Sequence, residues 1–324
     1  MCASLFGPEV EDFTLQSHST GSIVKNRLRF VAILFCFVVS SSGLLHAANP
    51  PGPISVMTFN IRYGTADDGP NRWEVRRGLV FDRMLGDSAD IIGLQEALRF
   101  QIDEIRAALP GFAEVGVGRD DGKSAGEHSQ ILYRSSRFDY GEGGTFWLSD
   151  TPEIPGSITW GNACTRICTW ARLFDKKNEQ WLYVYDLHLD HVSQRSRELG
   201  VQLVSKRIFE RRFKDPVIVM GDFNTGQENP VIPYMVGLRA LPDRDSVSTP
   251  NVFPLVDTYG VAHPGEPETA TYHAFQGGTQ GERIDYIFAS PGVEVKESFI
   301  DRSDRGGTFP SDHYPVVSKL VFHP

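Results

Sequence analysis

Polar side chains that can bind a metal ion or a phosphate group follow several apolar runs in this chain. The clearest case is the pair Asp222 and Asn224, which follows the apolar run Val217–Met220 and a single glycine. Glu96 ends a second apolar run, and Asn60 ends a third. Carboxylates can hold a divalent cation and activate water, while asparagine and histidine can hold phosphoryl oxygens. The combination predicts metal-assisted attack of water on a phosphate ester.

Histidines complete this set of groups. His188 and His191 follow the apolar stretch Trp181–Leu187. We expect His188 to contact phosphate or to act as a general acid, and His191 to be structural. Asp285 and His313 resemble an orienting pair, because a carboxylate that holds an imidazole raises its pKa and keeps it protonated. A protonated histidine of this kind can face a phosphate.

Each of these residues also has a structural interpretation. Asp222 and Asn224 could form an Asx turn that caps a helix. Glu96 could belong to the first turn of a helix, where the helix dipole favours an acidic side chain. His273 could reach the site from a loop or lie on the surface. The chemical interpretation therefore depends on the joint occurrence of the motifs.

The elements that must position these residues alternate along the chain. Helix-like stretches carry apolar residues at helical spacing, and strand-like runs are short and rich in branched residues. The predicted strands are Ile54–Ile61, Ile91–Leu94, Gln130–Tyr133, Ile167–Phe174, Trp181–Leu187, Val217–Met220, Ile284–Phe288 and Val316–Val321. The predicted helices are Arg72–Leu85, Leu98–Leu109, Ser193–Phe213 and Val231–Leu241. This order predicts an α/β protein with a mixed sheet.

The two halves of the chain look alike. Each contains a strand, a long helix and a second strand that ends in an acidic turn, at Glu96 in one half and at Asp222 in the other. This similarity indicates an internal duplication.

Composition sets broad limits on function. The chain has 324 residues, is 40% hydrophobic and carries a formal net charge of −9. That amount of apolar sequence is enough for one large core or two small ones. An acidic body argues mildly against a protein that binds nucleic-acid backbone, although a local basic cleft would not change the net charge.

The N-terminus has the pattern of an export signal. Three basic residues between positions 25 and 29 precede the uncharged stretch Phe30–Leu45, and small residues follow at Ala47 and Ala48. The alternative is a membrane anchor, but serines and a glycine interrupt the apolar stretch, which is short of the roughly 20 residues a span needs. We expect residues 1–48 to be an N-terminal extension and signal peptide, and the mature protein to be secreted or periplasmic.

Cysteine usage leaves two thiols in the expected mature chain. Cys2 and Cys36 lie in the segment that we expect to be removed, whereas Cys164 and Cys168 remain. On one extended strand these two residues would be about 13 Å apart, too far for a disulfide. An intervening turn could still join them, and we interpret them as packed thiols.

Three short motifs together are highly specific. Gly-Asp-Phe-Asn at 221–224, Ser-Asp-His at 311–313 and Leu-Gln-Glu at 94–96 resemble the endonuclease/exonuclease/phosphatase superfamily. The resemblance runs from about residue 54 to residue 321, and its wider pattern is similar to an uncharacterised exported bacterial branch. It implies one catalytic domain over residues 53–323, with a four-layer α/β sandwich fold. In that fold two mixed β-sheets pack face to face with helices outside, and the active site lies at one edge.

The resemblance also implies a metal site. Asn60 and Glu96 correspond to the family's metal-site pair, and Asp312 corresponds to a further ligand. The implied cofactor is Mg²⁺, with Mn²⁺ as the alternative.

The implied catalytic residues lie in the remaining motifs. Asp222 matches the residue that orients or deprotonates the attacking water, with Asn224 beside it. His313, supported by Asp285, matches the phosphate-binding histidine, and His188 matches the histidine of the nuclease and sphingomyelinase members.

One position departs from the family pattern. Asp186 stands where the family motif often has asparagine, two residues before His188. We expect this change to alter local hydrogen bonding and to leave His188 usable.

The sequence thus predicts a divalent-metal-dependent hydrolase of phosphate esters, either a phosphodiesterase or a phosphomonoesterase, acting outside the cytoplasm. We expect a monomer without a membrane span after cleavage, and a phosphate-ester substrate that the sequence does not identify.

Three alternatives remain. An extracellular nuclease would need basic or aromatic residues along its cleft, and the candidates are Arg62, Arg72, Arg76, Arg119 and Arg166. A sphingomyelinase-like phospholipase would need an exposed aromatic hairpin, and the loops contain no such adjacent pair. A binding module without activity would have a broken site, and no essential position is missing.

Overall fold

The computed structural model describes residues 50–267 and 269–323. All the elements reported below belong to the unit Asn49–Pro324. The predicted signal peptide, with Cys2 and Cys36, lies outside the described residues.

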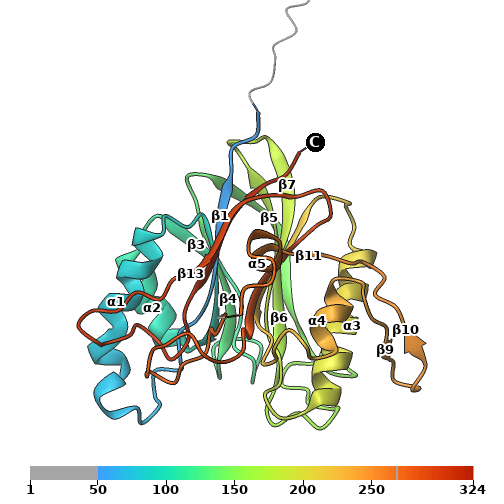
Figure 1. Cartoon of the computed structure of the whole chain (residues 1–324), viewed down its shortest axis with the longest axis horizontal. Coiled ribbons are helices and arrows are strands. Elements are labelled where there is room, and N and C mark those ends of the chain that lie inside the picture. The colour runs from blue at the N-terminus through green and yellow to red at the C-terminus, as the bar shows by residue number, and fades with distance from the viewer. Residues whose placement is uncertain (1–49, 268, 324) are drawn as a thin grey trace, which may run out of the picture. The chain divides into compact units, whose positions relative to one another are not determined.

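Two six-stranded sheets form the centre of this unit (Figure 1). The first sheet has the spatial order β13 (Glu294–Ile300), β14 (Val316–Val321), β1 (Ile54–Asn60), β2 (Ile91–Ala97), β4 (His128–Arg134) and β3 (Phe112–Val115). The second sheet has the order β11 (Val256–Asp257), β12 (Asp285–Ala289), β8 (Val217–Asp222), β7 (Gln180–His188), β6 (Ile167–Asp175) and β5 (Phe138–Trp147). The pairs β1–β2 and β7–β8 are parallel, and the other pairs in these sheets are antiparallel, so both sheets are mixed.

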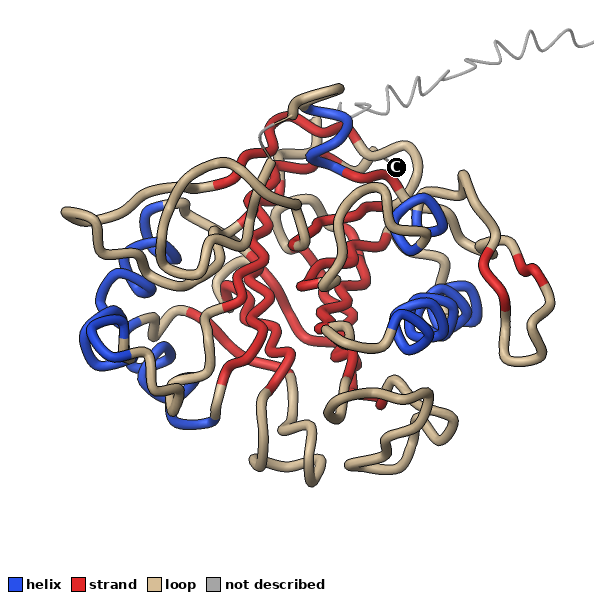
Figure 2. The backbone as a smooth tube through the Cα atoms, turned by 60° about the horizontal axis from the view of Figure 1, so that its bottom comes forward, coloured by secondary structure: helices blue, strands red, loops and turns tan. Residues whose placement is uncertain are grey.

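Helices cover the outer face of each sheet, as Figure 2 shows with the sheets between them. The helix α1 (Trp73–Gly86) and the helix α2 (Arg99–Ala108) share a buried apolar cluster with the first sheet. The helix α3 (Gln194–Glu210) and the short helix α4 (Val231–Met235) share another cluster with the second sheet. The smaller elements are η1 (Gly69–Asn71), α5 (Thr258–Ala262), β9 (Leu241–Pro242) and β10 (Ser248–Thr249).

The two sheets pack face to face through a third apolar cluster. Val56 of β1 and Ile218 of β8 belong to this cluster between the sheets, whereas Met57 and Val219 point outward to the helices. Successive residues of a strand point to opposite faces. Both faces of these strands are therefore buried, which explains their continuous apolar runs. The predicted four-layer sandwich is confirmed.

All eight predicted strands are present, and three longer strands were missed. The strand β5 contains three glycines, at 141, 143 and 144, and β13 has mostly exposed or half-buried residues. Both strands lie at the edge of a sheet, where less of the strand is buried, so their sequences lack an apolar run. The strand β3 has only four residues.

The fourth predicted helix is too long. It was expected to extend from Val231 to Leu241, but α4 ends at Met235. Gly237, with a φ of +79°, turns the chain in a conformation that a helix does not contain. The helices α1 and α2 begin and end within one residue of their expected bounds. The helix α3 begins one residue later than expected and ends at Glu210, before the predicted Phe213.

The expected internal similarity has a structural counterpart. Each half contains a parallel strand pair joined by a helix, β1-α1-β2 in the first sheet and β7-α3-β8 in the second. The carboxyl ends of parallel strands meet at one edge of a sheet. This arrangement places the ends of four central strands, with their polar residues, where a site can form.

Two further observations concern thiols and membranes. Cys168 is buried in β6, and Cys164 precedes that strand; both thiols are free, as expected for packed cysteines. None of the helices within residues 50–267 and 269–323 combines the length and hydrophobicity that a bilayer span requires.

Candidate active site

Gly221 and Asn224 shape the turn that carries Asp222. Gly221 has a φ of +147°, and a Cβ atom there would lie 2.0 Å from the carbonyl oxygen of Leu187. Only glycine therefore fits at this position. Asn224 has a φ of +49°, and its backbone N–H donates to Oδ1 of Asp222 at 2.8 Å. The expected Asx turn is thus present, but it does not cap a helix, because the next helix begins only at Val231 with Pro230 as its N-cap. The side chains of Asp222 and Asn224 both line a cavity.

Glu96 lies in a bulge at the end of β2. Its φ is +60°, and the register of β2 against β4 shifts between Leu94 and Ala97. The helix α2 begins only at Arg99, so Glu96 is not in a first helical turn. Oε2 of Glu96 accepts from the backbone N–H of Tyr63 at 3.1 Å. A left-handed non-glycine residue costs about 1–3 kcal/mol, and such strain often accompanies a functional role.

Asn60 joins the carboxylates of the two sheets. Its Nδ2 donates to Oε1 of Glu96 at 3.0 Å and to Oδ2 of Asp222 at 2.9 Å. Its Oδ1 accepts from the backbone N–H of Arg62 at 3.0 Å, which fixes the orientation of the amide. Asn60 and Glu96 belong to the first sheet and Asp222 to the second, so the site lies between the sheets.

The loop before β14 contributes Asp312 and His313. Oγ of Ser311 donates to the carbonyl oxygen of Asn60 at 2.7 Å, which ties this loop to the end of β1. Nδ1 of His313 lies 2.9 Å from Oδ2 of Asp285, and its Nε2 lies 3.9 Å from Oδ2 of Asp222. The predicted orienting pair is therefore present in the structure.

The charges around His313 favour its protonated form. Burial alone lowers the pKa of His313, but the charge and hydrogen bond of Asp285, with Asp222 and Asp312, raise it to about 10. Burial and the charge of Asp285 raise the pKa of Asp222 above its usual range. An imidazolium and a carboxyl group that titrates nearer neutrality thus lie side by side.

His188 has the opposite tendency. Burial, helped by the charges of Arg166 and Arg119, lowers the pKa of His188 well below its usual range. Its Nε2 lies 2.8 Å from Nδ2 of Asn224 and 3.4 Å from Oδ2 of Asp222. Because Nδ2 of Asn224 is a donor, Nε2 accepts, and the ring proton is assigned to Nδ1. A neutral ring favours a positioning role over a general acid.

Asp186 contacts the first sheet instead of the cavity. Its Oδ1 accepts from Nε2 of Gln95 at 2.6 Å, and its Oδ2 has no hydrogen-bond partner. Burial raises the pKa of Asp186 well above its usual range, which favours the neutral acid. His188, two residues later, still lines the cavity.

A cavity of about 530 Å³ brings these residues together. Among the residues expected from the sequence, six line it: Glu96, His188, Asp222, Asn224, Asp312 and His313. Asn60 and Asp285 lie behind the lining and hold it through the contacts described above. The sequence motifs therefore converge on one place. The lining residues that the motifs did not include are Tyr63, Glu127, Cys164, Tyr272 and Ile284.

The arginine candidates divide into two groups. Arg62, Arg119 and Arg166 line the cavity. Arg76 is buried elsewhere and donates to the backbone carbonyl groups of residues 61, 62, 71 and 310, which is a structural role. Arg72 does not line the cavity and is largely exposed.

Two further histidines differ from expectation. His273 is neither in the cavity nor on the surface: it is buried and stacks on the ring of Tyr314 with 3.9 Å between centroids. Its neighbour Tyr272 lines the cavity instead, 5.1 Å from the ring of His313. His191, expected to be structural, is exposed and lines the cavity, with Nδ1 2.9 Å from Arg166.

Comparison with known proteins identifies the family. Residues 57–313 match the Endonuclease/Exonuclease/phosphatase family. The chain belongs to this family. Members of the Endonuclease/Exonuclease/phosphatase family hydrolyse phosphate esters, which is the reaction class expected from the motifs.

Solved structures support this assignment over most of the chain. An endonuclease/exonuclease/phosphatase from Bacteroides vulgatus is 32% identical, with a TM-score of 0.75 over 84% of this chain and 99% of that one. The mannosyl-6-phosphatase of Bacteroides thetaiotaomicron is 31% identical, with a TM-score of 0.69 over 83% of this chain and 100% of that one. By sequence alone, an uncharacterized protein of Acanthamoeba polyphaga mimivirus is 26% identical over 188 residues, which cover 53% of this chain and 67% of the viral protein.

Family members generally use divalent metals, and the side chains here suit one. Burial raises the pKa of Asp312, and the charge of Glu96 raises it further, while His313 and Arg62 offset part of this effect. Two carboxylates that lie close enough for one to raise the pKa of the other favour a cation between them. Asp222, Asp285 and His313 form a second group with ligand atoms within 4.8 Å of one another. The donor set therefore fits a hard divalent cation.

Proposed function

We propose that this protein is a divalent-metal-dependent phosphomonoesterase that acts on a phosphorylated sugar outside the cytoplasm. The observation that carries the proposal is the position of Asp222, whose Oδ2 lies 2.9 Å from Nδ2 of Asn60 and 3.9 Å from Nε2 of His313. A carboxylate held beside an imidazolium in a cavity can deprotonate water next to a bound phosphate.

Asp222 has the features of a general base. A general base works best when its pKa lies near the operating pH, and burial with the charge of Asp285 raises the pKa of Asp222. The hydrogen bonds from Asn60 and from the backbone of Asn224 fix the carboxylate in one orientation. Asp222 would accept the proton of the attacking water.

His313 would hold the phosphoryl group. Nδ1 of His313 donates to Asp285, so Nε2–H is directed to the side of Asp222 and the cavity. A fixed cationic donor of this kind stabilises charge that develops on the phosphoryl oxygens. Arg62, Arg119 and Arg166 add positive charge to the cavity wall, which suits the dianion of a phosphate monoester.

A divalent metal would complete this charge distribution. Glu96 and Asp312 would hold it, with Asn60 positioning Glu96. When bound, the metal would neutralise phosphoryl charge and polarise the ester.

Two observations support a sugar phosphate as the substrate. The mannosyl-6-phosphatase of Bacteroides thetaiotaomicron is 31% identical, and the match covers 83% of the present chain. Tyr63 and Tyr272 line the cavity, and their rings provide an apolar surface for a hexose.

The test is a comparison of substrates under defined metal conditions. The purified protein would be assayed with Mg²⁺, Mn²⁺ or EDTA on mannose 6-phosphate, glucose 6-phosphate and p-nitrophenyl phosphate. Bis-p-nitrophenyl phosphate, single-stranded DNA and sphingomyelin represent the alternatives. We expect the monoesters to be hydrolysed fastest, EDTA to abolish the reaction and a metal to restore it. Faster hydrolysis of a diester, or full activity in EDTA, would overturn the proposal.

An extracellular nuclease is the second candidate. Three arginines line the cavity, although the whole chain has a net charge of −9. The DNA arm of the same assay decides between the two candidates.

We also propose that the protein is exported with cleavage near residue 48 or 49. The basic residues before Phe30–Leu45 and the small residues after it support this proposal. Mass spectrometry of the protein made by its own cells would give the mature N-terminus, and an intact segment 25–45 would contradict it.

A further inference from the structure

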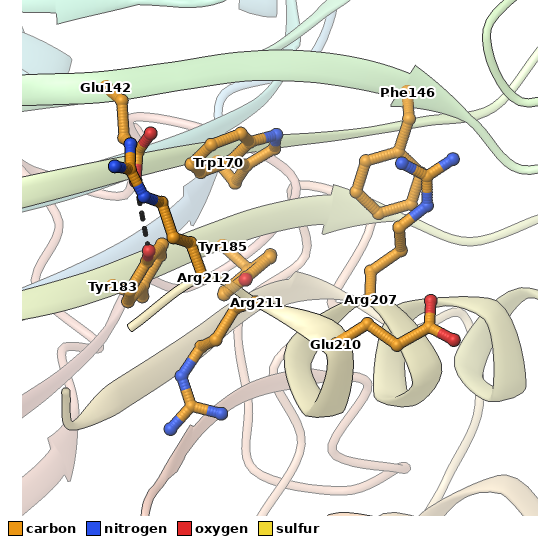
Figure 3. Close-up of a pocket in the computed structure, with 9 residues that line it drawn as sticks. All are labelled: Glu142, Phe146, Trp170, Tyr183, Tyr185, Arg207, Glu210, Arg211 and Arg212. Carbon is orange, nitrogen blue, oxygen red and sulfur yellow. Dashed lines mark hydrogen bonds between the residues drawn. The ribbon is translucent and has the colours of Figure 1, made fainter. Parts of the chain in front are cut away.

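A second cavity, of about 330 Å³, lies away from the candidate active site (Figure 3). It opens over the strands β5, β6 and β7 of the second sheet, beside the C-terminal end of α3. Its volume is near the lower end of the range of small-molecule sites, ~300–1,000 Å³. The lining residues are Glu142, Phe146, Trp170, Tyr183, Tyr185, Arg207, Glu210, Arg211 and Arg212.

Aromatic rings form the inner wall of this cavity. The ring of Trp170 lies 6.0 Å from that of Tyr183 and 6.5 Å from that of Tyr185, with interplanar angles of 30° and 25°. The two tyrosine rings are 6.3 Å apart at an angle of 22°. Tyr183 and Tyr185 are buried, with exposed fractions of 1% and 3%, whereas Trp170 is only partly buried and packs on them. Trp170 is therefore the aromatic ring that a ligand can reach.

The strand register explains why the ring of Trp170 is not fully covered. Gly144 pairs with Trp170, and Trp170 pairs with Tyr185, so the three residues form one row across the sheet. Gly144 contributes no side chain to the row. A Cβ atom built on it would lie 3.5 Å from Nε1 of Trp170, in ordinary contact with the ring. A glycine in the edge strand therefore leaves Trp170 uncovered.

The remaining lining residues carry charges of both signs. Glu142 comes from β5, and its Oε1 accepts from the hydroxyl of Tyr183 at 3.1 Å. Arg207 and Glu210 come from the last turns of α3, and Arg211 and Arg212 follow the helix. Hydrogen-bond acceptors and donors thus surround one aromatic surface, as Figure 3 shows.

We propose that this cavity binds a neutral pyranose ring. The faces of aromatic rings carry negative potential, which attracts the C–H groups on one side of a sugar ring. Sugar hydroxyls both donate and accept, so they can use carboxylates and guanidinium groups together. The negative charges of Glu142 and Glu210 disfavour an anionic ligand, and the positive charges of the three lining arginines disfavour a cationic one. A neutral ligand fits this mixture of charges.

This sugar site is separate from the candidate active site. Tyr183, Tyr185 and Leu187 of β7 point to the outer face of the sheet, whereas Asp186 and His188 lie on the inner side. A bound sugar would therefore not contact the reacting groups. The inference does not depend on the proposed function, because binding requires neither metal nor hydrolysis.

Binding of defined sugars to the purified protein tests the proposal. Calorimetry and tryptophan fluorescence would be measured with mannose, glucose and galactose, and with a mannan oligosaccharide, so that a free sugar and a glycan residue are distinguished. We expect saturable binding of at least one of them. Trp170→Ala and Gly144→Leu should each weaken binding at least tenfold, the first by removing the ring and the second by covering it. Trp170→Phe should retain most of the affinity.

Matched controls make the result decisive. Trp181 of β7 is a tryptophan of the same sheet that does not line the cavity, and Trp181→Ala should bind as the wild type does. Hydrolysis of a phosphate ester should stay within twofold in Gly144→Leu. Absence of saturable binding in the wild type would overturn the proposal, as would equal affinity in the wild type and folded Gly144→Leu. Binding of inorganic phosphate that Arg211→Ala abolishes would show an anion site instead.

Discussion

The amide nitrogen of Asn60 lies 3.0 Å from a carboxylate of Glu96 and 2.9 Å from a carboxylate of Asp222. One side chain of the first sheet therefore positions both the expected metal ligand and the expected base. We predict that Asn60→Ala lowers kcat by about 10²-fold, because both carboxylates lose a fixed donor. Asn60→Asp should be at least as damaging, since it adds a third negative charge. Steady-state kinetics with circular dichroism would check this, and an active, folded Asn60→Asp enzyme would contradict it.

Glu96→Gln should weaken metal binding. The substitution keeps the size of the side chain and removes one of two neighbouring negative charges, those of Glu96 and Asp312, that would attract the cation. We expect the apparent metal affinity to fall at least tenfold by calorimetry, and turnover to need more Mg²⁺. Glu228→Gln is the matched control, because Glu228 is exposed and does not line the cavity. Equal metal affinities in the two variants would refute the assignment.

Asp222→Asn and His313→Ala should each lower turnover by about 10²-fold or more, the scale for losing a general base or a charged phosphate contact. The double variant should lose far less than the product of the two single effects, because both groups act in one transition state. Both residues lie at the edge of the sheets, so the fold should persist. Kinetics on the three variants measure the coupling, and near wild-type rates for Asp222→Asn would remove the mechanism.

His188→Ala should reduce turnover more than His191→Ala. His188 is buried and contacts both Asn224 and Asp222, whereas His191 is exposed and contacts Arg166. We expect a loss of about tenfold or more for the first variant, and a smaller change for the second that appears mainly in KM. The reverse order in folded enzymes would transfer the positioning role to His191.

Asp186→Asn should stabilise the protein, and more so at higher pH. Burial raises the pKa of Asp186 well above the unfolded value of about 3.9. As the pH rises past that value, ionisation stabilises the unfolded chain but not the folded one, so wild-type stability falls. Asparagine avoids this loss and can still accept from Gln95. The difference in unfolding free energy should widen by up to about 1.4 kcal/mol per pH unit while Asp186 remains protonated.

Thermal unfolding between pH 4 and pH 8 measures this difference. Asp67→Asn is a suitable control, because Asp67 is exposed. The difference in unfolding free energy between Asp67→Asn and the wild type should therefore lack the contribution that burial makes at Asp186. A pH-independent difference for Asp186→Asn would show that the buried group is ionised in the folded protein.

The sequence by itself determined the central strands and the chemistry at their ends. Strands such as Val217–Asp222 are buried on both faces, so almost all their residues are apolar. Such a strand is therefore recognisable in the sequence as a continuous apolar run. Carboxylate, amide and imidazole groups after such runs limit the reaction to a few classes. Edge elements such as β5 lack this signal, because one of their faces contributes little to a core.

Only the tertiary structure decided which of these groups meet. Asn60 and Asp222 are 162 residues apart in the chain and come from different sheets. Nothing local to either residue specifies that contact, because it depends on how two sheets pack and on the register of each. The same holds for the pKa values of His188 and His313: burial lowers both, and only the charge and hydrogen bond of Asp285, with Asp222 and Asp312, raise that of His313. Local pattern encodes which face of a strand is apolar, whereas the electrostatic environment of a side chain is set by neighbours that folding brings from elsewhere.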